Sequence, residues 1–394
     1  MKKVLLVALV ATLIAVGCEK TEIINPQPEH GLTFSTNIGK LTKASDADNP
    51  GITNLQEQNF RVWAYAEYED QNTTATEQYN IYDGIENLAV TYTAGDNGAT
   101  GTWGTEKQYF WPGVDKSLTF FAVSVGKVLG SASEEFLGNS GETADSLTIT
   151  KNESTNSMVI TNFNVKDQYY NRDLMVADGV TQHQGDKRVD LKFHHTLSKV
   201  EFLFKTNKVE NTTDVINVWV QKVEVKDLAT QGKLTATMAA GTPSGEGTYQ
   251  GTQNPVSFTW ELTNDKTASF TDDYVTSYDG EDFPAKIDGI DATPDDKIAM
   301  KITNAGTTEE PAQNFTTWLM LPQNITDKLV EITYLINERQ FTSIFPLSTT
   351  SLTKWGENQH IRYIVNLSPN LISFDATVDD WTTPSTDTDV EHQN

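Results

Sequence analysis

The sequence contains a single cysteine, Cys18, among its 394 residues. One cysteine excludes an internal disulfide, a zinc site built from several thiolates, and the cross-linked framework that stabilises many small secreted domains. The folded chain must therefore owe its stability to the burial of apolar side chains.

Positive charge is also scarce, with 29 Lys and Arg against 54 Asp and Glu and a formal net charge of −25. Removal of the first 17 residues, which hold Lys2 and Lys3, lowers this to −27 because 27 cationic side chains then face 54 anionic ones. Such a charge argues against nucleic acid or an anionic membrane surface as a partner. It suits a surface exposed to the medium.

Catalytic and metal-binding motifs are missing as well. The chain has six histidines but no His-Glu-x-x-His, and it has no Gly-x-Ser-x-Gly elbow. His194 and His195 are neighbours within an alternating stretch, so their side chains point to opposite faces of a strand and do not chelate one ion together. His195 lies on the apolar face and is interpreted as a core residue. We therefore expect no enzyme activity, no cofactor and no metal, although an acidic stretch at 279–296 leaves calcium open as an alternative to a solvated loop.

Only one long apolar run is present, the 13 residues from Val4 to Val16. It is too short for a membrane-spanning helix, which needs about 20 residues, and it follows Lys2 and Lys3 as in a secretory signal. Small residues precede Cys18, as in bacterial lipoprotein signals. We expect cleavage between Gly17 and Cys18 and attachment of a diacylglycerol to the Cys18 thiol. An ordinary signal peptide with a chance cysteine is the alternative.

A short strand follows this anchor after a polar tether. Leu32, Phe34 and Ile38 alternate with polar residues, which predicts a strand with one apolar face. The next stretch, residues 40–51, has loop composition and carries Lys40 and Lys43. A protease that cut this loop would release the strand and the lipid together.

The rest of the chain favours an all-β fold. It has many aromatic, Val and Thr residues, no long helical pattern, and about 14 to 18 short stretches with strand-like alternation. A polar break near residue 185 predicts two β-sandwiches. The expected organisation is a signal peptide (1–17), a lipidated tether with a removable strand (18–43), an N-terminal sandwich (44–185), a C-terminal sandwich with an acidic insertion or loop near 265–314 (186–381), and a disordered acidic tail (382–394).

Several further stretches follow one another in a recognisable order. They are the lipoprotein signal to Cys18, the loop Leu41-Thr-Lys-Ala44, Tyr109-Phe-Trp-Pro112, Leu118-Thr-Phe-Phe-Ala122, Asp173-Leu-Met-Val-Ala177, Phe193-His-His-Thr-Leu-Ser-Lys-Val200, and Ile372-Ser-Phe-Asp-Ala-Thr-Val378 ending at Trp381. Taken together, they resemble the fimbrillin (type V pilin) family of lipoproteins from Bacteroidetes-type bacteria. The resemblance implies two tandem transthyretin-like β-sandwiches of Greek-key type, export to the outer membrane as a lipoprotein, and assembly into fimbriae outside the cell.

The resemblance also implies a route of maturation. A trypsin-like protease cuts after a basic residue behind the first strand, and a strand from another fimbrial subunit then fills the groove that the lost strand leaves. The matching residue is Lys43, followed by Ala44, where the family often has Arg. Lys40 and Arg61 are weaker candidates for the cut.

The position in the fibre stays open among three alternatives. No apolar alternation follows Trp381, so the chain resembles a tip or minor subunit that accepts a strand, donates none and mediates adhesion. A stalk subunit remains possible if 372–378 is itself donated, and an anchor would keep its lipid. A surface glycan-binding lipoprotein, with Trp103 and Trp260 as stacking platforms, is the alternative from another functional class.

Overall fold

The computed structural model confirms the all-β prediction, because every helix or strand assigned in it is a strand. Within the residues that the structure describes, no helix is long and apolar enough to cross a membrane. The structure describes residues 31–38, 59–68, 78–93, 102–112, 117–128, 148–152, 156–166, 172–183, 188–206, 217–239, 242–243, 252–273, 283–302, 312–368 and 371–381.

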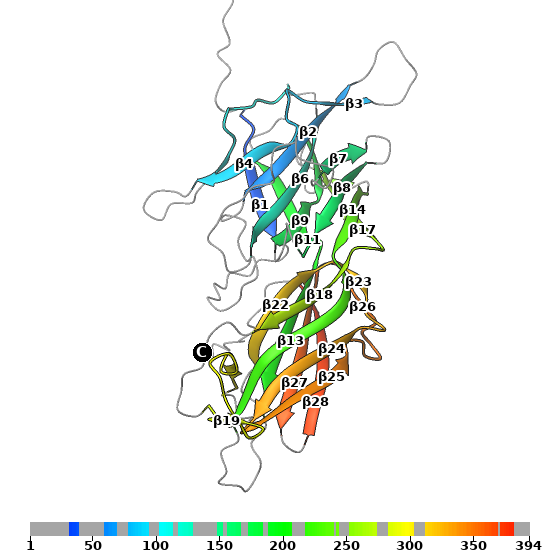
Figure 1. The fold of residues 1–394 in the computed structure, drawn as a ribbon. Helices are drawn as coiled ribbons and strands as arrows, with labels where there is room; N and C mark the ends of the chain where they lie inside the picture. The colour runs from blue at the N-terminus through cyan, green and yellow to red at the C-terminus, as the bar shows by residue number, and fades with distance from the viewer. Residues whose placement is uncertain are drawn as a thin grey trace, which may run out of the picture.

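Seven strands of the N-terminal part form one sheet that closes on itself, which the sequence did not predict (Figure 1). Neighbours pair in the order β6, β9, β11, β1, β5, β4 and β2, and β2 pairs again with β6. We call these seven strands the closed sheet. They are β1 (Phe34–Ile38), β2 (Phe60–Tyr68), β4 (Leu88–Thr93), β5 (Thr102–Gly104), β6 (Ser117–Val128), β9 (Arg172–Ala177) and β11 (Val189–His195).

Three strands of the closed sheet, β2, β6 and β9, are buried on both faces, whereas β4, β5 and β11 bury mainly one face and expose residues of the other. In β2, Val62 and Ala64 point into the apolar interior of the closed sheet, whereas Trp63 and Tyr65 belong to a second core. That second core is shared with a four-stranded sheet: β7 (Thr148–Asn152), β8 (Ser157–Asn164), β14 (Gln231–Met238) and β17 (Val256–Leu262). Four further strands belong to the same sheet as the seven strands of the closed sheet: β3 (Gln78–Ile81), β10 (Gly179–His183), β15 (Thr242–Pro243) and β16 (Thr252–Asn254).

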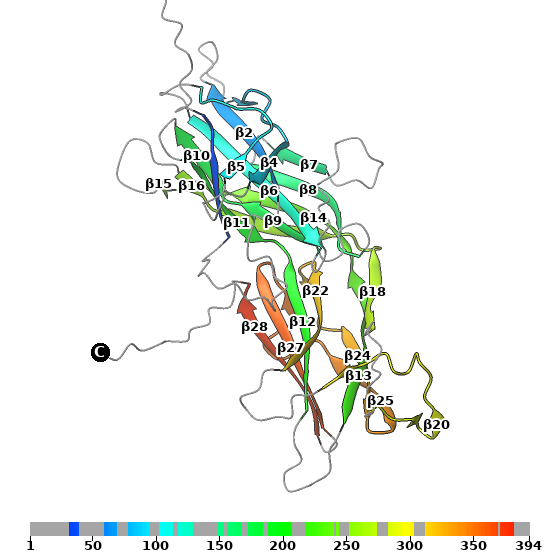
Figure 2. The ribbon, with the colours of Figure 1, turned by 90° about the vertical axis from the view of Figure 1, so that its left-hand side faces the viewer.

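The C-terminal part consists of two sheets that enclose a continuation of this second core (Figures 1 and 2). One sheet has the order β22, β12, β27, β28, with bounds Gln313–Met320, Ser198–Lys205, Gln359–Ser368 and Leu371–Asp380. The other has the order β18, β13, β24, β25, with bounds Thr267–Asp273, Val218–Ala229, Leu329–Ile336 and Arg339–Pro346. Short pairs complete the fold: β19 (Lys286–Ile287) with β20 (Ile290–Asp291), β23 (Gln323–Asn324) with β26 (Lys354–Trp355), and β21 (Met300–Lys301) with β13.

The acidic stretch 265–314 contains more regular structure than its composition predicted. The loop expectation was wrong for β18, which pairs with β13 through residues such as Phe270 opposite Val225. Further along, Phe283 packs edge-on against Trp219 with ring centroids 5.3 Å apart. Two buried aromatic side chains therefore tie a segment that is acidic by composition to the sheet.

Candidate functional site

The first strand, β1, completes the closed sheet. It runs parallel to β11, with Phe34 opposite Val189, and antiparallel to β5, with Phe34 opposite Trp103. Just before the strand, the Leu32 amide donates to the Tyr109 carbonyl (2.8 Å). Both edges of this segment are thus hydrogen-bonded, and we call the position between β11 and β5 the β1 slot.

Two apolar side chains of this segment fill the interior of the closed sheet. Leu32 and Phe34 are 6% and 3% exposed, whereas Thr33 between them faces solvent. Phe34 packs edge-to-face on Phe60 (centroids 6.1 Å apart) and on Phe120 (6.0 Å). Such pairs add to the free energy of apolar burial. The predicted removable strand is therefore a central part of this core.

The walls of the β1 slot are largely aromatic. Phe60 contacts Trp103 (5.0 Å between centroids) and Phe193 (5.4 Å), so the residues around Phe34 also pack on one another. Loss of β1 would expose this lining together with unpaired backbone groups on β11 and β5. In this structure the slot holds β1, an extended strand that pairs with both edges and packs on the aromatic lining.

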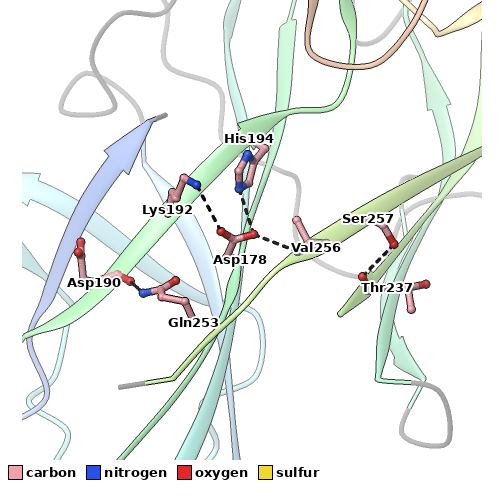
Figure 3. Close-up of polar contacts among 8 residues, drawn as sticks. All are labelled: Asp178, Asp190, Lys192, His194, Thr237, Gln253, Val256 and Ser257. Carbon is pink, nitrogen blue, oxygen red and sulfur yellow. Dashed lines mark hydrogen bonds and ion pairs between the residues drawn. The ribbon is translucent and has the colours of Figure 1, made fainter. Parts of the chain in front are cut away.

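Contacts away from β1 also hold β11 in place (Figure 3). Asp178, which is 5% exposed, accepts a hydrogen bond from the Val256 amide (3.0 Å) and lies 3.0 Å from His194 Nε2 and 3.9 Å from Lys192 Nζ. Burial alone would raise the pKa of Asp178. The hydrogen bond and charge of His194, the Val256 amide and the charge of Lys192 outweigh burial and lower it. The carboxylate therefore stays ionised and ties two residues of β11 to the start of β17.

A second pair of contacts is made by Asp190, near the start of β11. The Gln253 side-chain amide donates to the Asp190 carbonyl of β11 (2.9 Å; Figure 3), and the Ser35 hydroxyl of β1 donates to the Asp190 carboxylate (3.3 Å). Only the second of these contacts involves β1. The contacts that Asp178 and Gln253 make with β11 therefore do not involve β1.

The end of β11 contacts the end of the last strand. His195 is buried, as the sequence predicted for a core histidine, and its Nδ1 lies 2.7 Å from Asp173 Oδ2. The indole of Trp381 stacks on the imidazole with centroids 3.9 Å apart. Strand β11 therefore pairs with β1 through its first five residues, Val189–Phe193. Its last residue, His195, contacts Trp381, which follows β28.

The structure places only some of the predicted site residues. Gly17, Cys18, Lys43 and Ala44 lie outside the described residues, as does Lys40. Ile38 pairs with Phe193 through the backbone. Arg61, the weaker candidate for cleavage, lies inside β2 between β4 and β6, and its guanidinium donates to the Asn87 carbonyl (2.9 Å).

The two tryptophans considered as glycan platforms are engaged within the fold. Trp103 is buried against Phe60 and Tyr92, and Trp260 is half-buried and donates its indole N–H to the Thr196 carbonyl (2.9 Å). Across the described ranges, no group of three or more His, Cys, Asp or Glu side chains is arranged to hold a metal ion.

Sequence reasoning identified the strand but missed the slot around it. The alternation of Val189–His195 marked a strand, yet nothing in it indicated that this strand pairs with a segment 155 residues earlier. Phe60 and Phe120 were recognisable as apolar strand positions only. A pairing between distant segments leaves no local signal in one sequence.

Comparison with known proteins gives one family and a set of distant structures. A family model described as Fimbrillin-like matches residues 42–381. Solved structures similar to this chain include a fimbrial protein from Bacteroides vulgatus (16% identity, 90% of this chain and 100% of that chain, TM-score 0.48). Putative cell adhesion proteins from Bacteroides uniformis (13%, 90% and 98%, 0.43) and Bacteroides ovatus (15%, 90% and 98%, 0.44) are also similar. No curated protein matches the chain.

Proposed function

Because this chain belongs to the fimbrillin-like family, we propose that it is a fimbrial subunit that binds a β-strand of another subunit in its β1 slot. The observation that carries the proposal is that β1 completes the closed sheet and fills its aromatic interior with Phe34. A strand from a neighbouring subunit would restore the same backbone pairing and the same apolar contacts after β1 is lost.

The route to that exchange begins with an exported precursor. Cleavage between Gly17 and Cys18 and lipidation of Cys18 attach it to the outer membrane. A trypsin-like protease then cuts after Lys43, before Ala44. This bond lies between the end of β1 at Ile38 and the start of β2 at Phe60, so the cut would release β1 together with the lipid and leave the rest of the subunit for the fimbrium outside the cell.

Within the fimbrium, the chain fits a tip or minor subunit with a role in adhesion. A stalk subunit must donate a strand. The last described strand, β28, pairs with β27 along its whole length of ten residues, from Leu371 opposite Ser368 to Asp380 opposite Gln359. Trp381 then anchors its end on His195. Donation of β28 would break this ladder, which favours acceptance over donation.

The finer architecture belongs to the same proposal. We propose two tandem domains related to transthyretin-like β-sandwiches of Greek-key type, with the closed sheet as the variant feature of the first. The expected boundary near residue 185 does not separate them in space, because β11, β14 and β16 pair with β9, β8 and β10 of the N-terminal part. The role is structural, without catalysis. A glycan-binding lipoprotein is less well supported because Trp103 and Trp260 are engaged in internal contacts.

The test is the intact mass and the N-terminal sequence of the protein from isolated fimbriae and from membranes. We expect a lipid-free chain that begins at Ala44 in fimbriae and a diacylated chain that begins at Cys18 in the precursor. Lys43→Ala should leave the protein lipid-bound and unassembled, whereas the control Arg61→Ala should be processed normally. Fimbriae that contain the Lys43→Ala protein, or a chain that still begins at Cys18, would refute the exchange.

A further inference from the structure

The two facing C-terminal sheets are joined unequally at their two sides. On the side of β18 and β22, Phe270 packs on Trp318 (centroids 5.8 Å apart), and the Asp272 carboxylate accepts hydrogen bonds from the Trp318 indole (2.8 Å) and the Thr316 hydroxyl. Polar and aromatic contacts thus close this side. On the other side, β25 and β28 are the last strands of their sheets, and no described strand pairs with the outer edge of either.

A half-covered apolar stripe lies between these two edges. The contact described across it is the stack of Phe345 on Phe374, with centroids 5.1 Å apart and planes at 4°. Ile372 and Val378 face the core side of β28, opposite the buried Leu367 and Ile361, but are 36% and 41% exposed. We call this stripe the seam, and it consists of Phe341, Phe345, Ile372, Phe374, Ala376 and Val378.

The edge of the seam is acidic. Asp375 and Asp379 lie on the outer face of β28, where they alternate with the seam residues, and Asp380 ends the strand. Arg362 of the neighbouring strand pairs with Asp379. Asp375 and the net charge of −25 repel a second copy of the chain and attract a basic partner.

We infer that the seam binds one extended strand of a different protein chain, with bulky apolar residues at alternate positions and Lys or Arg between them. The apolar side chains cover Phe345, Phe374 and Val378, the backbone pairs with the edge of β25 or β28 that no described strand covers, and a basic side chain lies beside Asp375. This site is separate from the β1 slot, because it lies on the other sheets and needs no loss of a strand. It gives the subunit a second place for a partner.

The test uses the non-lipidated chain from residue 19 onward and a nine-residue peptide that alternates valine and lysine. A peptide of the same composition, with the valines and the lysines in two blocks, is the control. We expect the alternating peptide to bind more tightly, and we expect hydrogen exchange to show new protection in 339–346 and 371–380. Equal affinity for both peptides would mean that charge attraction alone causes the binding, and this would overturn the inference. Absence of binding, or protection at 31–38 and 189–195 instead, would overturn it too.

Two neighbouring substitutions provide the matched variants. Val378→Lys places a charge in the seam and should weaken binding by about tenfold or more, because an inward charge on an edge strand blocks pairing. Thr377→Lys adds the same charge on the outer face and should weaken binding by no more than about threefold. Ile372→Lys serves as a second seam variant, and unchanged unfolding curves show that each variant folds. Equal losses for Val378→Lys and Thr377→Lys would contradict a strand in the seam.

Discussion

Trp381 lies flat against His195, with ring centroids 3.9 Å apart and planes that differ by 8°. The buried Asp173 contacts the edge of the imidazole, with its Oδ2 atom 2.7 Å from Nδ1. The contact joins the end of the last strand to β11, the strand that pairs with β1. The C-terminal sheets are thus physically linked to one wall of the β1 slot.

Trp381→Ala should lower the free energy of unfolding by about 3 kcal/mol, as expected for loss of a buried aromatic side chain. Trp381→Phe, which keeps a ring on the imidazole, should cost about half as much or less. Urea unfolding followed by circular dichroism measures both. Equal losses in the two variants would show that the stack contributes nothing beyond the neighbouring backbone.

Phe34→Ala in the uncut precursor should lower the free energy of unfolding by about 3–5 kcal/mol, because it empties the aromatic interior of the closed sheet. Thr33→Ala is the matched control, since its side chain faces solvent, and should change stability by about 0.5 kcal/mol or less. Guanidinium unfolding of the two variants tests this. A small effect of Phe34→Ala would mean that β1 is not part of the core.

The chain cut after Lys43 should bind the peptide Gly-Leu-Thr-Phe-Ser-Thr-Asn-Ile, residues 31–38, because the peptide restores both edges and the aromatic contacts. A peptide with Phe34→Asp should bind at least about tenfold more weakly, since it buries an unpaired charge. A peptide with Thr33→Asp carries the same charge on the solvent side and should bind nearly as well as the original. Fluorescence anisotropy measures the three affinities, and equal affinities would refute an apolar slot.

Stability should fall at low pH through Glu201. Burial would raise the pKa of this carboxyl, but hydrogen bonds and charges from His360 (2.7 Å) and Lys199 (2.9 Å) lower it from 4.5 to about 2. A lowered folded pKa means that the stabilisation is present above about pH 4.5 and is lost as the pH falls toward about 2. Unfolding midpoints across this range measure the loss.

Glu201→Gln is the variant that isolates this carboxyl. It should lower the free energy of unfolding at pH 7 by about 3–5 kcal/mol, because the buried Lys199 and His360 then lose the carboxylate that both contact. Its stability should also change less between pH 4.5 and pH 2 than that of the parent chain. An identical pH profile for the two proteins would assign the acid sensitivity to other groups.

Local alternation was enough to find many strands. The alternation at residues 32–38 predicted β1, and the alternating stretch that holds His194 and His195 predicted the strand β11. Alternation also assigned Phe34 and His195 to apolar faces, where the structure buries them. Acidic composition misled at 267–273, because Phe270 is the only bulky apolar residue of β18 and the structure buries it in the core.

The amino-acid sequence by itself determined the strand content, the faces that are apolar, the presence of a single cysteine and the membership of a family. Which strands become neighbours was decided by the tertiary structure alone: β1 beside β11, Trp381 on His195, and Phe345 on Phe374. The reason is physical. A strand's period depends on its own residues, whereas its partners depend on which distant segments bury one another's edges and side chains.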